Sequence, residues 1–549
     1  MSAPLRLALL ALTACAADPD PPAPTLAPVR YADVTRAAGI DFVMRSGGRT
    51  KNYIVEAKGG GGAFFDYDGD GRLDIYLVNG SRFGTVPDSA QTNVLYRNTG
   101  SGAFRETTHE SGSGDNGWGM GCAVADYDND GYPDLYITNY GPNVLYRNEG
   151  GAFAPAPAGV DLDGWSTSAT FGDYDLDGDL DLYVAQYLNF LPDATPPRGG
   201  MWKGVLVFAG PLGLPGAQDA LYRNEGDGRF SEVTRRAKAG KLDPTYGLGA
   251  LFCDYDDDGD PDIYVANDSA PNFLYRNEGD GTFHDVGLEA GAALSSEGGT
   301  QAGMGIAYDD YDMDGDRDLF VTHFEDDYNT LYQNVGDGRF TVASAAAGLA
   351  APSLPHLAFG TFFLDYDNDR DRDLFAANGH VYPQIRHVNT AGYAEANQLF
   401  VNQGPDSGYR FSAVSAGDLN APNVSRGAAG GDYDDDGDID LLVCNLDEPP
   451  ALLRNDGGNQ RNWLTLYLQG TASNRDGIGA KITVSTGDIV QTVELISGGS
   501  FLSHSDPRAH FGLGFYQRAQ AEIRWPSGQV QHLEDLAANQ LLTVVEPNP

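Results

Sequence analysis

Short apolar runs alternate with a repeated polar string along most of this chain. The string reads Asp-Tyr-Asp-x-Asp-Gly-x-x-Asp, with one departure described below, and begins at Asp66, Asp126, Asp173, Asp254, Asp310, Asp365 and Asp432. After the first copy, residues 75–79 form an apolar run that is typical of a β-strand rather than a helix. We therefore expect each polar string to be a loop that joins two strands.

Two further patterns follow the polar string. The first is an expected strand with the sequence Leu-Tyr-Arg-Asn or a close variant, which ends at Asn98, Asn148, Asn224, Asn277, Asn334, Asn402 and Asn455. The second, present in most repeats, is a Gly-rich turn before an aromatic strand, as at 228–234. Four short strands repeated seven times, at intervals of 47 to 81 residues, predict an all-β fold with a seven-bladed β-propeller. An open β-solenoid is the alternative, although solenoid repeats are usually shorter.

The ends of the repeat region suggest how the ring closes. The last repeat lacks its own fourth strand after Asn455, whereas residues 31–39 resemble the fourth strand at 230–234. We expect this N-terminal segment to complete the seventh blade.

The polar string has the composition of a metal-binding loop. It places carboxylates at positions 1, 3, 5 and 9, and a glycine at position 6 permits a sharp turn. Such a flexible, all-oxygen site suits Ca²⁺ better than Mg²⁺. An EF-hand closes its loop with a Glu at position 12, but position 12 is apolar in all seven copies, so we expect position 9 to close this loop. The alternative is a solvated acidic turn without metal, in which the clustered carboxylates would repel one another.

Up to seven Ca²⁺ ions are therefore expected. The expected ligands are the loop carboxylates together with the backbone carbonyl expected at position 7, namely Asp66, Asp68, Asp70, Arg72 and Asp74; Asp126, Asp128, Asp130, Tyr132 and Asp134; Asp173, Asp175, Asp177, Asp179 and Asp181; Asp254, Asp256, Asp258, Asp260 and Asp262; Asp310, Asp312, Asp314, Arg317 and Asp318; Asp365, Asp367, Asp369 and Asp373; and Asp432, Asp434, Asp436, Asp438 and Asp440. In the sixth copy Arg370 replaces the glycine. We expect this site to bind Ca²⁺ most weakly, or to use Arg370 as partial charge compensation.

The charge of the chain follows from these loops. The formal net charge is −43, and the seven strings hold 35 of the 78 acidic residues. This balance excludes nucleic acid as a partner, because phosphate binding needs a basic surface.

The N-terminus resembles a bacterial lipoprotein signal. Arg6 precedes an apolar run, and Leu-Thr-Ala stands directly before Cys15. We expect a signal peptide at 1–14, lipidation at Cys15 and an extended tether at 15–29, so that the protein is exported and lipid-anchored to the outer membrane or cell surface. The alternative is an ordinary secretory signal, which predicts a periplasmic or secreted protein. The other cysteines, Cys122, Cys253 and Cys444, are expected to be buried free thiols.

Two regions resemble known families. The phrases at 64–71 and 94–98 resemble FG-GAP or VCBS repeats, the blades of the integrin α-subunit head, and the likeness covers 30–456. That resemblance implies Ca²⁺ in the loop between the first two strands of a blade. Residues 457–549 are expected to form a small β domain, and the phrases at 477–484, 510–514 and 523–528 are similar to the ASPIC/UnbV domain. The two regions together resemble the cartilage acidic protein family, which implies an architecture more than an activity.

The repeats also predict which face carries recognition. The aspartate loops share one face, while the connections between second and third strands lie on the other and lengthen in blades one, three and six. Long loops on a rigid scaffold often carry binding sites. In the blade-three insertion Phe190, Trp202 and Phe208 either face a sugar or protein partner or pack onto the propeller. The tyrosine at position 2 of each loop is expected to pack between blades rather than bind ligand.

The same face also carries residues of a second candidate site. His323, His356 and His380, with Glu325 and Asp326, either form a transition-metal or substrate site or are ordinary loop residues. The run Ser503-His504-Ser505-Asp506 is not a catalytic triad, because adjacent residues do not make one. We expect a non-enzymatic, calcium-binding surface module that binds an extracellular protein or glycan. The alternative is a calcium-dependent polysaccharide lyase or hydrolase that uses His323 and His380.

Overall fold

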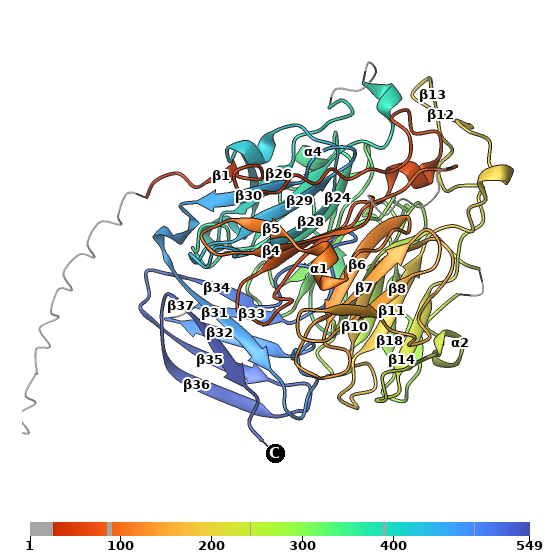
Figure 1. Ribbon diagram of the computed structural model, residues 1–549. Coiled ribbons are helices and arrows are strands. Elements are labelled where there is room, and N and C mark those ends of the chain that lie inside the picture. The colour runs from red at the N-terminus through yellow and green to blue at the C-terminus, as the bar shows by residue number, and fades with distance from the viewer. Residues whose placement is uncertain are drawn as a thin grey trace, which may run out of the picture.

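Seven four-stranded antiparallel sheets make up the larger part of the structure (Figure 1). The structure is a computed structural model that describes residues 26–84, 91–241, 243–386, 388, 391–487 and 489–548. We number these sheets as blades one to seven. They consist of β2 (Gly62–Phe65), β3 (Asp74–Leu77), β4 (Val94–Asn98) and β5 (Phe104–Glu106); β6 (Gly119–Ala125), β7 (Asp134–Asn139), β8 (Val144–Asn148) and β9 (Phe153–Pro155); β10 (Ser166–Gly172), β11 (Asp181–Gln186), β14 (Ala220–Asn224) and β15 (Phe230–Glu232); β16 (Gly247–Cys253), β17 (Asp262–Asn267), β18 (Phe273–Asn277) and β19 (Phe283–Asp285); β20 (Ile306–Asp309), β21 (Asp318–Val321), β22 (Thr330–Asn334) and β23 (Phe340–Val342); β24 (Ala358–Leu364), β25 (Asp373–Asn378), β26 (Gln398–Asn402) and β27 (Phe411–Val414); and β28 (Ser425–Gly431), β29 (Asp440–Asn445) and β30 (Ala451–Asp456) with β1 (Arg30–Asp33).

The sheets form a ring around a central axis. Their first strands contact one another in the cyclic order β2, β6, β10, β16, β20, β24, β28 and again β2. The outer strand of the seventh sheet is β1, which pairs antiparallel with β30 so that Tyr31 lies opposite Asn455. The predicted β-propeller is confirmed, and its N-terminal strand lies in the sheet that would otherwise have three strands.

The remaining elements of the ring are short. They are α1 (Thr108–Ser111), α2 (Thr234–Ala237), α3 (Gly287–Ala290) and α4 (Ala350–Ser353); the 3-10 turns η1 (Ile54–Ala57), η2 (Pro192–Ala194), η3 (Pro383–Ile385), η4 (Pro405–Ser407), η5 (Asp418–Asn420) and η6 (Gly458–Gln460); and the hairpin of β12 (Gly200–Trp202) and β13 (Val205–Val207). The hairpin belongs to the blade-three insertion, on the side of the ring opposite the C-terminal strands (Figure 1).

A small all-β domain follows the ring. One sheet has the order β34 (Ala509–Gly514), β31 (Asn462–Gln469) and β37 (Gln540–Val545), and the other has the order β33 (Ile489–Glu494), β32 (Lys481–Thr486), β35 (Arg518–Arg524) and β36 (Val530–Ala537). In β32 the buried residues alternate with partly exposed ones, which is the period-two pattern of a strand with one face on a core. Leu466, Ile482, Phe511 and Trp525 are buried in the core of this domain.

The chain between β33 and β34 enters the central channel of the ring; we call residues 497–506 the plug. Backbone hydrogen bonds join Ser500 to Ile306 in both directions, at 2.7 and 2.8 Å, and the carbonyl of Leu502 to the N–H of Cys122 at 3.2 Å. The backbone of His504 bonds to Gly62 and Phe64 of β2 in the same way. Further bonds reach β10, β24 and β28. The plug therefore contacts six of the first strands by hydrogen bonds.

The tip of the plug is apolar and completes the core along the axis. Phe501 and Leu502 are buried with residues contributed by many blades, including Val55, Trp165 and Phe359. The fit is close, because a side-chain carbon at Gly61 would lie 1.8 Å from the carbonyl oxygen of Leu502. The channel is thus filled by the chain itself.

Two expectations concern the rest of the chain. Cys122, Cys253 and Cys444 are buried free thiols, as predicted. Cys15, the expected lipidation site, and the expected signal peptide lie outside the described residues. Over the described ranges, no helix is long and apolar enough to cross a membrane.

Candidate functional site

Each aspartate loop is organised around the carboxylate at its first position. In the first loop Asp66 accepts hydrogen bonds from the backbone N–H groups of Gly69, Asp70 and Gly71, at 2.9, 3.1 and 2.7 Å. The chain can turn this tightly because Gly71 has a φ of +86°, which favours glycine. The bonds from positions 5 and 6 to position 1 recur in the other six loops, so all seven share one backbone geometry.

The carboxylate at the ninth position ties the loop to the third strand of its blade. Asp74 accepts hydrogen bonds from the backbone N–H groups of Tyr67 at 3.2 Å and Asn98 at 2.7 Å. The side-chain amide of Asn98 donates in turn to the carbonyl of Tyr433, in the loop of the neighbouring blade, at 2.8 Å. Equivalent bonds run from Asn148, Asn224, Asn277, Asn334, Asn402 and Asn455 to the carbonyls of Tyr67, Tyr127, Tyr174, Tyr255, Tyr311 and Tyr366. Seven asparagine side chains therefore link the loops in a closed circle.

Sequence reasoning missed this role of asparagine. The motif that ends in Asn98 was expected only as a strand, although asparagine recurs at its last position in all seven repeats. A buried amide that satisfies carbonyl groups of two neighbouring blades explains the recurrence.

The loop carboxylates gather closely enough to hold a metal ion. In each cluster three side chains place one oxygen apiece within 4.8 Å of the others. Five such clusters are Asp66, Asp68 and Asp70; Asp126, Asp128 and Asp134; Asp173, Asp175 and Asp181; Asp254, Asp256 and Asp262; and Asp310, Asp312 and Asp318. The expected ligands at positions 1, 3 and 9, or 1, 3 and 5, thus lie together in these loops.

In six loops an oxygen at the third position is buried without a hydrogen-bond partner in the described part of the chain. These oxygens are the Oδ1 atoms of Asp68, Asp128, Asp256, Asp312, Asp367 and Asp434. An unpartnered buried carboxylate oxygen costs free energy. The carboxylate atoms that could coordinate a metal ion in these clusters are all oxygens, so the residues fit a hard divalent cation such as Ca²⁺.

Burial also raises the pKa values of these carboxyl groups. The pKa of Asp74 rises to about 8 and that of Asp134 to about 9, chiefly through desolvation and further through the neighbouring carboxylates. At neutral pH such groups are fully ionised only when positive charge lies close to them. A bound cation would supply that charge.

The sixth loop keeps the shared geometry despite Arg370. The backbone N–H of Arg370 donates to Asp365 at 2.8 Å, and its φ of +86° is costly for a residue with a side chain. Its guanidinium lies over the ring of Tyr516, 5.1 Å from the ring centroid. Burial raises the pKa of Asp371 to about 6, and the charge of Arg370 opposes this shift.

One expected ligand needs correction. Position 7 of the fifth loop is Asp316, whose N–H donates to Asp314 at 3.0 Å, and Arg317 is the residue after it. The guanidinium of Arg317 reaches back to the fourth loop, 2.8 Å from the carboxylate of Asp257 and 3.1 Å from the carbonyl of Asp254. Arg317 therefore neutralises a neighbouring loop through its side chain.

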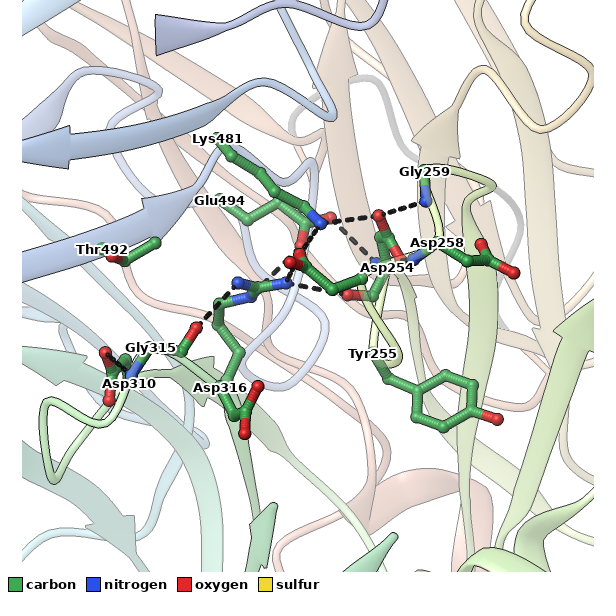
Figure 2. Close-up of polar contacts among 12 residues, drawn as sticks. Asp254, Tyr255, Asp258, Gly259, Asp310, Gly315, Asp316, Lys481, Thr492 and Glu494 are labelled. Atoms are coloured by element: carbon green, nitrogen blue, oxygen red, sulfur yellow. Dashed lines mark hydrogen bonds and ion pairs between the residues drawn. The ribbon is translucent and has the colours of Figure 1, made fainter. Parts of the chain in front are cut away.

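The C-terminal domain covers the aspartate-loop face. Lys481 and Glu494 reach the fourth loop, where Lys481 Nζ lies 2.6 Å from the carboxylate of Asp254 and Glu494 accepts the Asp254 N–H at 3.0 Å (Figure 2). At the seventh loop Arg508 lies 3.1 Å from the carboxylate of Asp435. Basic side chains of this domain thus share in balancing the loop charge.

The face opposite the aspartate loops carries aromatic residues. Phe190 and Phe208 are buried, and the ring of Trp202 meets that of Phe324 with centroids 5.1 Å apart. The aromatic residues of the blade-three insertion therefore pack onto the propeller. The position-2 tyrosines also pack, since Tyr67, for example, lies against Phe153 of the neighbouring blade with centroids 6.1 Å apart.

The three histidines on this face do not form one site. His380 Nε2 lies 3.3 Å from Glu325, which also pairs with Lys203 at 3.0 Å. His356 pairs instead with Glu395 at 3.4 Å.

His323 is fully buried, and neither ring nitrogen has a hydrogen-bond partner among the described residues. Burial lowers its pKa to about 3, so its imidazole is neutral. Asp326 joins the His380 group only through Lys203, at 2.9 Å.

Comparisons with known proteins divide the chain into the same two parts, the propeller and the C-terminal domain. The family described as FG-GAP-like repeat matches residues 66–137, 126–184, 206–265, 254–321 and 310–376, and the family described as ASPIC and UnbV matches residues 470–549. Cartilage acidic protein 1 of Homo sapiens is 28% identical over 319 residues, which are 56% of this chain and 45% of that protein. The Xenopus tropicalis protein of the same name is 27% identical over 296 residues, 52% of this chain and 43% of that protein. The matched region thus spans less than half the length of these relatives.

The similarity to solved structures is weaker than the similarity to these relatives. A lectin of Agrocybe aegerita has a TM-score of 0.36 and 16% identity, over 66% of this chain and 80% of the lectin. The rhamnogalacturonan lyase of Bacillus licheniformis has a TM-score of 0.34 and 12% identity, over 72% of this chain and 71% of the lyase. Scores this low carry no argument about activity. The FG-GAP-like matches, by contrast, cover more than half of the chain, so the protein belongs to the FG-GAP-like repeat family and carries an ASPIC and UnbV module at residues 470–549.

Proposed function

We propose that this protein is a calcium-stabilised, non-enzymatic interaction module, exported and lipid-anchored through Cys15, that binds an extracellular protein or glycan. The observation that carries the calcium proposal is the set of buried aspartate oxygens in six loops that find no hydrogen-bond partner among the residues the structure describes. Each bound Ca²⁺ would accept those oxygens and offset the charge of the surrounding carboxylates. Its role is structural, because the C-terminal domain lies over the loop face.

The ligand is expected on the opposite face, where the chain varies most. The blade-three insertion exposes four large apolar side chains, Leu191, Met201, Leu206 and Leu212, each more than half exposed. Exposed apolar residues gathered on one insertion are typical of interaction sites. The aspartate loops, by comparison, are repeated, polar and partly covered.

The test measures binding of the intact protein and of its variants to arrays of proteins and glycans. We expect the triple variant Met201→Ser, Leu206→Ser, Leu212→Ser to lose binding at least tenfold. The matched control is Val530→Ser, an exposed apolar residue of the C-terminal domain. Equal binding by both variants would place the ligand site elsewhere.

Calcium and the anchor are tested separately. Isothermal titration of the metal-depleted protein should give several calcium sites. Mass spectrometry of the mature protein should give a lipidated Cys15, and Cys15→Ser should release the protein from the membrane fraction. A single calcium site, or an unmodified Cys15, would contradict the respective part of the proposal.

A second candidate function is hydrolysis or elimination on a polysaccharide. One observation favours it: Lys203, Glu325 and His380 are grouped on the ligand face, and a carboxylate beside an imidazole can support acid–base chemistry. Release of reducing ends from polysaccharides, abolished by Glu325→Gln, would establish this function. Ligand binding without any such release supports the interaction module.

A further inference from the structure

Arginine side chains gather on the face opposite the aspartate loops, where three connections of the ring meet. The chain between β1 and β2 contacts the blade-three insertion, because the backbone N–H and the Nε atom of Arg198 donate to the carbonyl and side-chain oxygens of Asn52, both at 3.1 Å (Figure 1). It also contacts the chain between β25 and β26, because the amide of Gln384 donates to the carbonyl of Thr50 at 2.7 Å. The arginines of these three connections, which we call the arginine patch, are Arg45, Arg49, Arg198 and Arg386.

The arginine patch carries positive charge that remains available to a partner. Arg45, Arg49 and Arg386 are exposed, and Arg198 is partly exposed. Within the part of the chain that the structure describes, none of the four forms an ion pair with an acidic side chain. The patch therefore differs in sign from the protein as a whole, whose formal net charge is −43.

The acidic side chains that contact the segment 45–53 hold it in place. Lys51 is buried, and its Nζ atom pairs with the carboxylate of Asp447 at 2.7 Å. The carboxylate of Glu56 accepts hydrogen bonds from two backbone N–H groups of the segment, at 2.8 and 2.9 Å. Both carboxylates are thus already used, and the segment that presents two of the patch arginines is preformed, which lowers the entropy cost of binding.

A buried arginine adds positive charge beneath this segment. Arg426 is fully buried and donates to the carbonyls of Ala57, Gly379 and Ser425 at 2.7, 2.8 and 2.7 Å. Burial lowers its pKa to about 10, so its guanidinium is charged at neutral pH. Ala57 ends η1, the turn that follows the segment 45–53, so this charge lies under the same region of the recognition face.

Exposed apolar side chains border the arginine patch. Phe83 is 36% exposed, Leu191 65% and Met201 66%. The ring of Phe83 meets that of Tyr53 at 5.4 Å between centroids and that of Phe190, which precedes Leu191, at 6.5 Å. Met201 follows Arg198 by three residues. A partner at the patch would therefore meet guanidinium groups and accessible apolar surface together.

We propose that this surface binds an acidic segment of a partner protein, one in which Asp and Glu residues stand beside apolar residues. The proposal rests on the proposed function, since it names the chemistry of the partner on the recognition face. Guanidinium groups form paired hydrogen bonds with carboxylates. Protein interfaces are enriched in arginine, methionine and aromatic residues. The exposed Leu191 and Met201 match apolar side chains of a protein better than the hydroxyl groups of a glycan.

The acidity of the rest of the molecule does not prevent this contact. Charges on a protein surface are largely screened beyond about 8 Å at physiological ionic strength. An acidic segment at the patch therefore interacts mainly with the arginines beside it, whereas the aspartate loops lie on the other face of the ring.

The test probes an array of random dodecapeptides with the intact, calcium-loaded protein. We expect the bound peptides to be enriched at least threefold in Asp and Glu and also enriched in Leu and Phe. Isothermal titration of the peptide that binds best should show that Arg49→Gln with Arg386→Gln weakens binding at least tenfold. The matched control is Arg229→Gln with Arg235→Gln, two exposed arginines of blade three whose loss changes the net charge equally. Its affinity should stay within twofold of the unchanged protein.

A second pair of variants tests the apolar border. We expect Leu191→Ser to weaken binding of the same peptide at least fivefold. The control is Leu288→Ser in α3, because Leu288 is 66% exposed and matches Leu191 in exposure. Equal affinities of these two variants would overturn the proposal, and so would bound peptides without enrichment in Asp and Glu or equal losses in the two arginine double variants.

Polygalacturonate serves as the competing probe. If it binds through Arg49 and Arg386 and is indifferent to Leu191→Ser, while acidic peptides do not bind, the partner is an acidic glycan and the assignment to a protein segment falls. The proposed function survives that failure as long as array binding still depends on Met201, Leu206 and Leu212. If array binding is also absent, both fall.

Discussion

The aspartate-loop face and the opposite face of the ring differ in regularity, charge and cover. On the first, seven loops repeat one hydrogen-bond pattern around a carboxylate, and a second domain lies over them. On the second, insertions of different length carry aromatic and exposed apolar side chains, among them Phe190 and Met201. Repetition thus builds the scaffold, and the departures from repetition lie on the face where we propose that recognition occurs.

We expect the largest effect on stability from removing calcium, because all the proposed ions lie in the aspartate loops on one face. If each site had a Kd near ~0.1 mM at ~2 mM Ca²⁺, the linkage would be roughly 1.8 kcal/mol per site. Chelation should therefore lower the melting temperature of the ring sharply, as measured by scanning calorimetry, and added Ca²⁺ should restore it. An unchanged melting temperature would remove the structural role of the loops and with it the contrast between the faces.

A second test removes the side chain at the tip of the plug. Leu502→Ala deletes a buried side chain from the axial core and should cost about 2–5 kcal/mol of unfolding free energy in denaturant titration. The control is Phe515→Ala, at an exposed aromatic residue of the same domain. If Leu502→Ala costs no more than the control, the plug does not unite the ring with the C-terminal domain.

A third test uses pH. Burial lowers the pKa of His504 in the plug to about 4, below the ordinary value of 6.5, so the imidazole is neutral in the folded protein. A base whose pKa is depressed by folding contributes stability that is complete above about pH 6.5 and is lost as the pH falls toward 4. His504→Gln should flatten this part of the stability profile relative to the unchanged protein, measured at saturating Ca²⁺. The exposed His109→Gln is the control, and identical profiles for the two variants would refute the assignment.

The smallest expected effect concerns the one irregular loop. Arg370→Gly relieves a φ of +86° but removes the contact with Tyr516, so the two changes oppose each other and stability should change by less than about 1 kcal/mol. Calcium binding by the sixth loop should tighten nevertheless, because a positive charge leaves its vicinity. Calcium titration of the two proteins checks this, and equal affinities would mean that Arg370 does not weaken the site.

The sequence predicted those parts of the molecule that repeat. The position of each loop and the propeller follow from the nine-residue string, and the terminal strand at Tyr31 matches an internal one. The plug could not be predicted, because residues 497–506 have no periodic pattern and their fit depends on hydrogen bonds to six strands that lie far away in the sequence. The grouping of His380 with Glu325 was one of the two expected alternatives, but the pairing of His356 with Glu395 instead could not be predicted, since it depends on how connections of two blades pack.

The position of β1 has a mechanical consequence. Four residue pairs between β1 and β30 fasten the N-terminal strand into the seventh blade, and β1 is also where the N-terminal segment enters the fold. Tension applied to that segment would load the hydrogen bonds between Ala27 and Gln460 and then this short strand. We therefore expect force on the N-terminal segment to separate β1 from β30, and we expect force on a bound ligand not to do so.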